Sequence, residues 1–156
     1  CPWLRLQPRR FATLGPSHQF LDRVRGQLAE AGCGDRFTYR GELDRDGKIA
    51  FLRGLDVLSV PATYDEPKGM FLLEAMATGV PVVQPRRGAF TEIVELTGGG
   101  LLVDPDDPSS IAAALARLLD DDALAARLRI GGPARAAEFT WERTDMAATL
   151  KKAAGL

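Results

Sequence analysis

The sequence has few of the residues on which disulfide scaffolds, zinc sites and histidine-dependent hydrolases rely. Its 156 residues include two cysteines, Cys1 and Cys33, and one histidine. Two cysteines that form no Cys-x-x-Cys pair argue against a disulfide framework and against structural zinc. One histidine without a Gly-x-Ser-x-Gly motif gives a serine-hydrolase triad little support. We therefore expect both thiols to be reduced and structural.

Long apolar runs and an excess of one charge are also lacking. No segment approaches the roughly 18 to 20 consecutive apolar residues that cross a bilayer, and the N-terminal segment lacks a secretory apolar core. The 20 basic and 21 acidic residues leave a formal net charge of -1, which gives no reason to expect a nucleic-acid partner. We expect a cytoplasmic protein. A full-length protein that contains this chain could also bind peripherally to the inner face of the membrane.

What the sequence does contain is a regular alternation of short apolar runs and amphipathic segments, which is typical of βαβ units. We predict an α/β fold with a Rossmann-like parallel sheet and flanking helices. The predicted strands are 10–14, 37–40, 57–60, 81–84 and 101–103. The predicted helices between them are 17–31, 44–52, 69–78 and 91–96. Segment 57–60 is apolar almost throughout and is predicted to be a central strand.

The C-terminal part of the chain predicts only helices. Asp107 followed by Pro108 is a good helix start, because proline is tolerated at the first helical position. Residues 131–133, Gly-Gly-Pro, are predicted to break the next helix, and Thr140 to cap a final one. The expected result is an all-helical tail after the sheet. Because the chain begins with a residue other than Met, we expect it to be part of a longer protein.

The segment YDEPKGMFLLEAMATG, residues 64–79, carries the candidate site. It follows a predicted strand, and ligands of open parallel sheets bind at the carboxyl ends of strands. Gly69 lets the backbone approach a ligand, and the amides that open the next helix suit a phosphate or diphosphate. Glu66 and Glu74 flank that helix start and would repel a phosphate unless they accept hydroxyl hydrogen bonds. A sugar nucleotide offers such hydroxyls on both sides of its diphosphate.

A longer run of sequence around this site resembles a known family. Residues 59–94, SVPATYDEPKGMFLLEAMATGVPVVQPRRGAFTEIV, are followed by GGGLLVDPDD at 98–107. Together they resemble the donor-binding half of the retaining glycosyltransferases of family 4, or group 1, which have the two-domain GT-B architecture. The family's Glu-x7-Glu motif falls at Glu66 and Glu74. The resemblance implies that residues 1–156 are a single nucleotide-sugar-binding domain, the C-terminal half of a GT-B fold.

The resemblance also implies roles for individual residues. Glu66 is implied as the catalytic residue that contacts the transferred sugar, and Glu74 as the residue that binds the ribose. The backbone amides implied to meet the sugar and diphosphate are those of Gly69, Met70 and Phe71, while the turn implied to lie near the base is Gly41, Glu42 and Leu43. No metal and no cofactor are implied, since the helix start would stabilise the leaving diphosphate.

The sequence departs from the family pattern in two places. Pro67 and Lys68 replace a small residue and an aromatic one, and Lys68 is a candidate for a positive charge directed at the diphosphate. The family's Arg and Lys pair near the start of the donor domain has no match here. Arg86 and Arg87 follow a predicted strand, and we expect a surface pair, with phosphate contact as the alternative.

The functional hypothesis is a retaining glycosyltransferase of hexosyltransferase type, of which this chain binds the nucleotide-sugar donor. Its other expected partners are an acceptor glycan, lipid or small molecule and an N-terminal acceptor domain outside this chain. The isolated chain is expected to be inactive. One alternative is a non-catalytic module that binds a nucleotide or a sugar phosphate. Another is a glycosidase that uses Glu66 and Glu74 as its carboxylate pair.

Overall fold

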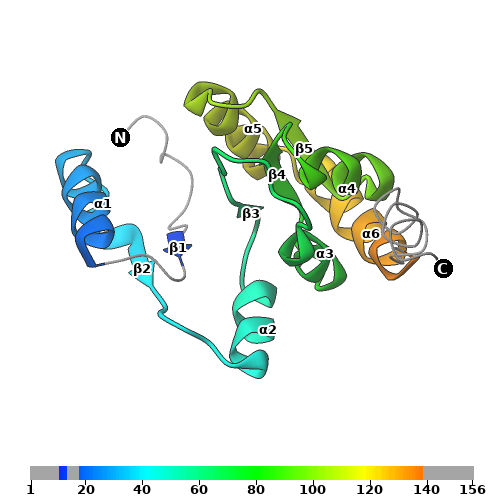
Figure 1. Cartoon of the computed structure of the whole chain (residues 1–156), viewed down its shortest axis with the longest axis horizontal. Helices are drawn as coiled ribbons and strands as arrows, with labels where there is room; N and C mark the ends of the chain where they lie inside the picture. The colour runs from blue at the N-terminus through cyan, green and yellow to red at the C-terminus, as the bar shows by residue number, and fades with distance from the viewer. Residues whose placement is uncertain (1–10, 14–17, 139–156) are drawn as a thin grey trace, which may run out of the picture. The chain divides into compact units, whose positions relative to one another are not determined.

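The computed structural model describes residues 11–13 and 18–138 (Figure 1). The chain falls into two compact units, Cys1–Lys48 and Ile49–Leu156. The first unit contains β1 (Phe11–Thr13), α1 (His18–Glu30), the 3-10 helix η2 (Gly34–Arg36) and β2 (Phe37–Tyr39). β1 and β2 run parallel, with Phe11 beside Phe37. Both predicted strands and the helix between them are therefore confirmed.

The end of α1 shows why the helix stops where the sequence predicts. Gly32 adopts a left-handed φ of 68°, and its amide donates to the Ala29 carbonyl at 2.9 Å. The Cys33 amide donates to the Leu28 carbonyl at 2.7 Å, which completes a glycine-terminated helix end. The Cys33 side chain is a buried free thiol, as expected. Ser17, the first residue of the predicted helix 17–31, lies outside the described residues.

Helix α2 (Arg45–Arg53) follows and runs from the first unit into the second. Its start is the one predicted: Asp44 Oδ1 accepts a hydrogen bond from the Gly47 amide at 2.8 Å. The side chain thereby satisfies one of the amides that a helix start leaves without a partner.

The second unit is built on a parallel sheet of three strands in the order β3-β4-β5. Its elements are β3 (Leu58–Ser59), α3 (Met70–Ala77), β4 (Val82–Pro85), α4 (Ala89–Thr97), β5 (Gly100–Val103), α5 (Pro108–Asp120) and α6 (Asp122–Glu138). Ser59 lies beside Val83, and Val83 beside Leu101. β4 is buried at every position, whereas β3 is half-buried. Among these three strands the middle one is β4. The prediction that 57–60 is central concerns the whole five-strand sheet and stays a prediction.

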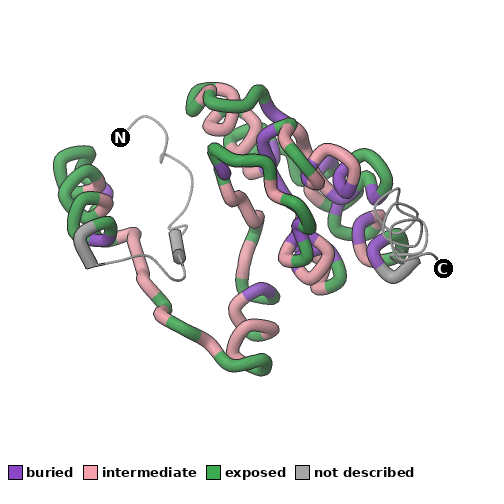
Figure 2. The backbone as a smooth tube through the Cα atoms, viewed as in Figure 1, coloured by how far each residue is buried: buried purple, intermediate pink, exposed green. Residues whose placement is uncertain are grey.

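Helices cover both faces of this sheet, and successive residues of β4 point to opposite faces. Val82 packs with buried residues of α3 and α4, and Val83 with buried residues of α5 and α6. Figure 2 colours the buried positions of the chain purple, and they lie on these helices and strands. The largest members of the two clusters are Leu72, Met76, Phe90 and Ile93 on one face and Leu118, Leu124 and Leu128 on the other. Each such side chain contributes about 1.5 to 3 kcal/mol when fully buried. The layered α/β prediction is confirmed.

The helical tail agrees with the prediction at one end and differs at the other. α5 begins at Pro108, and Asp107 Oδ1 accepts from the Ser109 amide at 2.9 Å. The predicted break at 131–133 is wrong, because α6 continues through these residues. Gly132 is buried there, and a Cβ on it would lie 3.5 Å from Gly99 Cα and 3.6 Å from the Met76 side chain. Close packing of α6 against its neighbours thus overrides the weak helix propensity of glycine and proline.

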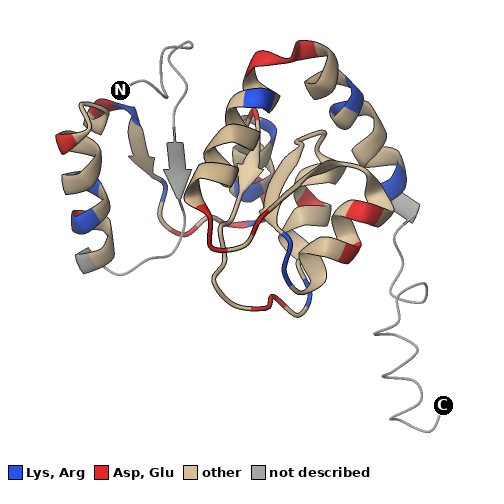
Figure 3. Ribbon diagram, turned by 90° about the horizontal axis from the view of Figure 1, so that it is seen from above, with Lys and Arg blue, Asp and Glu red and all other residues tan. Residues whose placement is uncertain are grey.

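Charged residues lie on the helices and loops of the described chain, while β4 and β5 carry none (Figure 3). Among the helices that the structure describes, none is long and apolar enough to cross a membrane. The predicted final helix from Thr140 lies outside the described residues.

Candidate functional site

The loop between β3 and α3 places the Glu66 carboxylate at the start of α3. Glu66 Oε1 accepts hydrogen bonds from the Gly69 amide at 3.1 Å and the Lys68 amide at 3.2 Å. Oε2 accepts from the Tyr64 hydroxyl at 3.4 Å. The Gly69 and Lys68 amides lower the pKa of Glu66. The Tyr64 hydroxyl lowers this pKa slightly further, whereas burial raises it. Glu66 is therefore an anion at neutral pH and can accept further hydrogen bonds.

Gly69 is the residue before α3 and lies where the backbone conformation favours glycine. Its φ of 59° is left-handed, and a Cβ would lie 2.8 Å from Ile93 Cδ1. No side chain caps the helix at this position. Gly69 is buried and joins the Glu66 loop directly to the first turn of α3.

The residues implied to offer backbone amides, Gly69, Met70 and Phe71, lie together at this helix start. The Gly69 amide is already bonded to Glu66. The amides of Met70 and Phe71 are in the first turn of α3, where an amide has no helical acceptor. The Met70 side chain is exposed, whereas Phe71 packs edge to face on Phe90 with ring centroids 5.7 Å apart. Phe71 is thus available to a ligand through its backbone.

The second glutamate of the motif, Glu74, lies in the middle of α3 and is half-buried. It is five residues past Gly69, which is about 7.5 Å along a helix axis. Lys68 is exposed beside the helix start. The turn Gly41, Glu42 and Leu43 belongs to the first unit, in which Gly41 has a left-handed φ of 67° and Glu42 is exposed. The structure therefore brings Glu66, Gly69, Met70 and Phe71 together, with Glu74 further along the same helix.

Gly88, in the loop after β4, was not singled out by the sequence analysis, yet it contacts the backbone of Glu66. Its φ is 49° and its ψ is -142°, and it is the residue before α4. A Cβ on Gly88 would lie 2.6 Å from the Glu66 carbonyl oxygen and 2.8 Å from the Glu66 nitrogen. The next amide, that of Ala89, donates to the Glu66 carbonyl at 2.8 Å. The signal in the sequence was a glycine between a predicted strand and a predicted helix.

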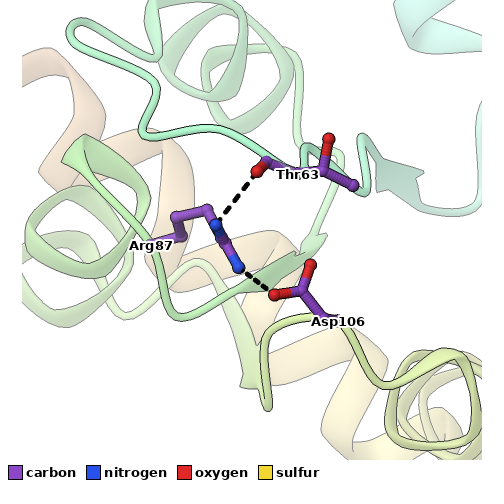
Figure 4. Close-up of polar contacts among 3 residues, drawn as sticks. All are labelled: Thr63, Arg87 and Asp106. Atoms are coloured by element: carbon purple, nitrogen blue, oxygen red, sulfur yellow. Dashed lines mark hydrogen bonds and ion pairs between the residues drawn. The ribbon is translucent and has the colours of Figure 1, made fainter.

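Arg87 connects the loops that follow three strands (Figure 4). Its guanidinium donates from Nη1 to the Thr63 carbonyl, 3.0 Å away in the loop after β3, and pairs through Nη2 with Asp106 in the loop after β5. Its side chain is 20% exposed, whereas that of Arg86 is 55% exposed and pairs with Glu95. Arg86 is exposed, as predicted, whereas Arg87 is half-buried and has partners in the two neighbouring loops.

The aspartates at 104, 106 and 107 lie between β5 and α5, and Asp107 forms the predicted helix start. Asp106 has a positive φ of 61° and faces Arg87, while Asp107 caps α5. Across the described residues, no group of three or more His, Cys, Asp or Glu side chains is arranged to hold a metal ion.

Comparison with known proteins agrees with the geometry. The family model described as "Glycosyl transferases group 1" matches residues 7–135, which include the whole of the Glu66 loop and α3. The chain belongs to the group 1 glycosyltransferases. The D-inositol 3-phosphate glycosyltransferase of Acidothermus cellulolyticus is 37% identical to this group 1 chain over 123 residues. That match covers 79% of this chain and 27% of the relative, so the chain spans about a quarter of the length of that protein.

Solved structures of glycosyltransferases share the fold of this group 1 chain. Sucrose-phosphate synthase from Thermosynechococcus elongatus superposes with a TM-score of 0.74 and 31% identity, over 92% of this chain and 38% of the synthase. The Anabaena protein Alr3699/HepE, solved in complex with UDP-glucose, superposes with a TM-score of 0.74 and 22% identity, over 83% of this chain and 36% of the other. These neighbours have the GT-B fold, which confirms the predicted fold class.

Proposed function

We propose that this chain is the donor-binding part of a retaining glycosyltransferase that acts in the cytoplasm. It binds a nucleoside-diphosphate sugar, and an N-terminal domain outside this chain binds the acceptor. The observation that carries the proposal is the Glu66 carboxylate, held by two amides at the start of α3 in a chain of this family. The Anabaena structure with UDP-glucose supports a uridine diphosphate sugar as the donor to test.

The start of α3 is suited to the diphosphate. A helix start carries about half a positive charge. The helix itself supplies no acceptor for the first-turn amides of Met70 and Phe71, so they can donate to a ligand. Lys68 adds an exposed positive charge beside them. As the bond between the sugar and the diphosphate breaks, negative charge grows on the diphosphate, and these groups stabilise it without a metal ion or cofactor.

Glu66 is suited to a hydroxyl group of the transferred sugar. An ionised carboxylate has about four acceptor positions, and the Gly69 amide, the Lys68 amide and the Tyr64 hydroxyl use three of them. The remaining position can accept a sugar hydroxyl while the loop keeps its shape. Glu74, further along α3, accepts the hydroxyls of the ribose. The two glutamates thus bind opposite sides of the diphosphate.

Transfer requires both substrates to be enclosed, and this chain supplies groups for the donor alone. We therefore expect the isolated chain to bind the donor weakly and not to transfer sugar. The acceptor is a glycan, a lipid or a small molecule, chosen by the other domain.

The proposal is tested by titrating the chain with UDP and with UDP-glucose and following the amide signals of residues 66–74 by NMR. Both ligands should shift the signals of Met70 and Phe71, and Glu66→Gln should weaken UDP-glucose binding while leaving UDP binding unchanged. Glu95→Gln is the matched control, because Glu95 is exposed and pairs with Arg86 outside this loop. If neither ligand perturbs residues 66–74, the donor site is wrong. Hydrolysis of an aryl glycoside that Glu66→Gln abolishes would instead support a glycosidase.

A further inference from the structure

We propose that Gly88 is a positioning residue for Glu66. Because Gly88 has no side chain, the loop after β4 lies directly against the peptide of Glu66 and fixes where that residue stands at the start of α3. The inference rests on the proposed function, since it concerns the placement of the residue assigned to the donor sugar.

The contact between Gly88 and Glu66 is made by backbone atoms on both sides. A Cβ on Gly88 would meet the Glu66 oxygen at 2.6 Å, the Glu66 nitrogen at 2.8 Å and the Asp65 carbonyl carbon at 3.1 Å. A flexible side chain could rotate away from such a Cβ, but peptide atoms move only if the loop itself moves. A side chain at position 88 must therefore displace Glu66.

The conformation of Gly88 leads to the same requirement. Its φ of 49° with a ψ of -142° is a backbone conformation that residues with a side chain rarely adopt. Among the described glycines with positive φ, Gly88 is the one at which a Cβ would come within 3 Å of backbone atoms. Gly98, at the other end of α4, has a similar φ of 62°, but a Cβ there would meet nothing nearer than Arg135 Nη1 at 3.6 Å.

The residues on either side of Gly88 hold the same loop. Arg87 donates to the Thr63 carbonyl at 3.0 Å, and the Ala89 amide donates to the Glu66 carbonyl at 2.8 Å. Three consecutive residues after β4, 87–89, thus contact the middle of the loop after β3, between Thr63 and Glu66. Glu66 in turn bonds the Gly69 amide, so a displaced Glu66 backbone changes the distance between its carboxylate and the start of α3.

A purely structural glycine would affect folding without affecting Glu66 in particular, and a pair of variants separates the two cases. Gly88→Ala and Gly98→Ala each place a side chain at a left-handed position at one end of α4. In the NMR spectrum of the chain, Gly88→Ala should shift the amide signals of Glu66, Lys68 and Gly69, and Gly98→Ala should leave them in place. If folded Gly88→Ala leaves these three signals unchanged, the inference is wrong.

Binding gives a second readout that a structural role would not change selectively. Gly88→Ala should lower the affinity for UDP-glucose by about tenfold relative to UDP, the size of one charge-assisted hydrogen bond. In a Glu66→Gln background the same substitution should cost nothing further, because residues that act as one unit are not additive. Equal losses in both backgrounds would contradict the proposal.

A second variant applies if Gly88→Ala does not fold. Ala89→Pro keeps Gly88, places proline at the first position of α4 where helices accept it, and removes the amide that donates to Glu66. It should shift the same three signals, and unchanged signals would again overturn the inference. If the unmodified chain binds neither UDP nor UDP-glucose, the proposed function fails, whereas the NMR comparison still decides whether Gly88 positions Glu66.

Discussion

The backbone amides at the starts of α3 and α5 have different hydrogen-bond partners. At α5 the residue before the helix, Asp107, accepts from the Ser109 amide with its own side chain. At α3 the residue before the helix is Gly69, which has no side chain to do so, and the nearby carboxylate comes from Glu66, three residues earlier. The first arrangement completes a helix locally. The second leaves first-turn amides close to the Glu66 carboxylate. A helix start of this kind can bind a ligand through both groups.

The largest expected effect is on the residue that makes the start of α3 unusual. Gly69→Ala should lower the free energy of unfolding by about 2 to 5 kcal/mol, from about 1 to 2 for the left-handed backbone and about 1 to 3 for the overlap with Ile93. Urea denaturation measures this change. Gly79→Ala, after the other end of α3, is the matched control, because a Cβ there meets nothing nearer than the Arg129 carbonyl at 3.9 Å. Equal losses for the two variants would show that the overlap with Ile93 contributes nothing.

The next effect is on nucleotide binding, which we expect to depend on α3 and not on α5. Glu74→Gln should weaken UDP binding by about 1.5 to 3 kcal/mol, the contribution of hydrogen bonds to a charged acceptor. Binding of glucose 1-phosphate, which lacks the ribose, should not change. Isothermal titration calorimetry with both ligands measures the difference. If both affinities fall by the same factor, Glu74 does not contact the ribose.

A smaller effect is expected at α5, and on stability alone. Asp107→Ala removes the side chain that caps this helix and should cost about 1 kcal/mol of unfolding free energy. The affinity for UDP should stay the same, because the start of α5 has a complete local cap. Thermal unfolding and calorimetry of the same sample test both statements. A loss of UDP affinity in Asp107→Ala would remove the distinction between the two helix starts.

The features that sequence could predict are those set by neighbours in the chain. Asp107 with Pro108 marks a helix start, and Gly32 marks a helix end. Each depends on residues within a few positions, so the pattern is visible without coordinates. The roles of Glu66 and Glu74 in one site stay a prediction. The family resemblance then supplied roles for the two glutamates, which composition and spacing alone could not.

The features that sequence missed depend on segments that are distant in the chain. Gly88 contacts Glu66 from the loop after a different strand, and Arg87 acquires partners in two further loops. The continuation of α6 through Gly132 follows from its packing on Met76 and Gly99, which overrides local propensity. Which arginine of the pair at 86 and 87 is exposed likewise follows from the tertiary fold.

The smallest expected effect is on the acid dependence of stability, and it concerns the amides that distinguish α3. Because the Gly69 and Lys68 amides lower the pKa of Glu66 in the folded chain, Glu66 stabilises the fold above the ordinary pKa of a glutamate, about 4.3. This contribution is lost as the pH falls through the lowered value, and it is small because the carboxylate is partly exposed and screened by water. Unfolding of Glu66→Gln should therefore depend less steeply on pH in that range than unfolding of the unmodified chain.

Direct titration of the Glu66 carboxyl by 13C NMR gives the sharper test of the same point. A pKa below the ordinary value means that the amides at the start of α3 reach the carboxylate in solution without any ligand. A pKa at or above the ordinary value would mean that they do not. In that case Glu66 would not be held at the helix start by its own loop, and α3 would lose the feature that sets it apart from α5.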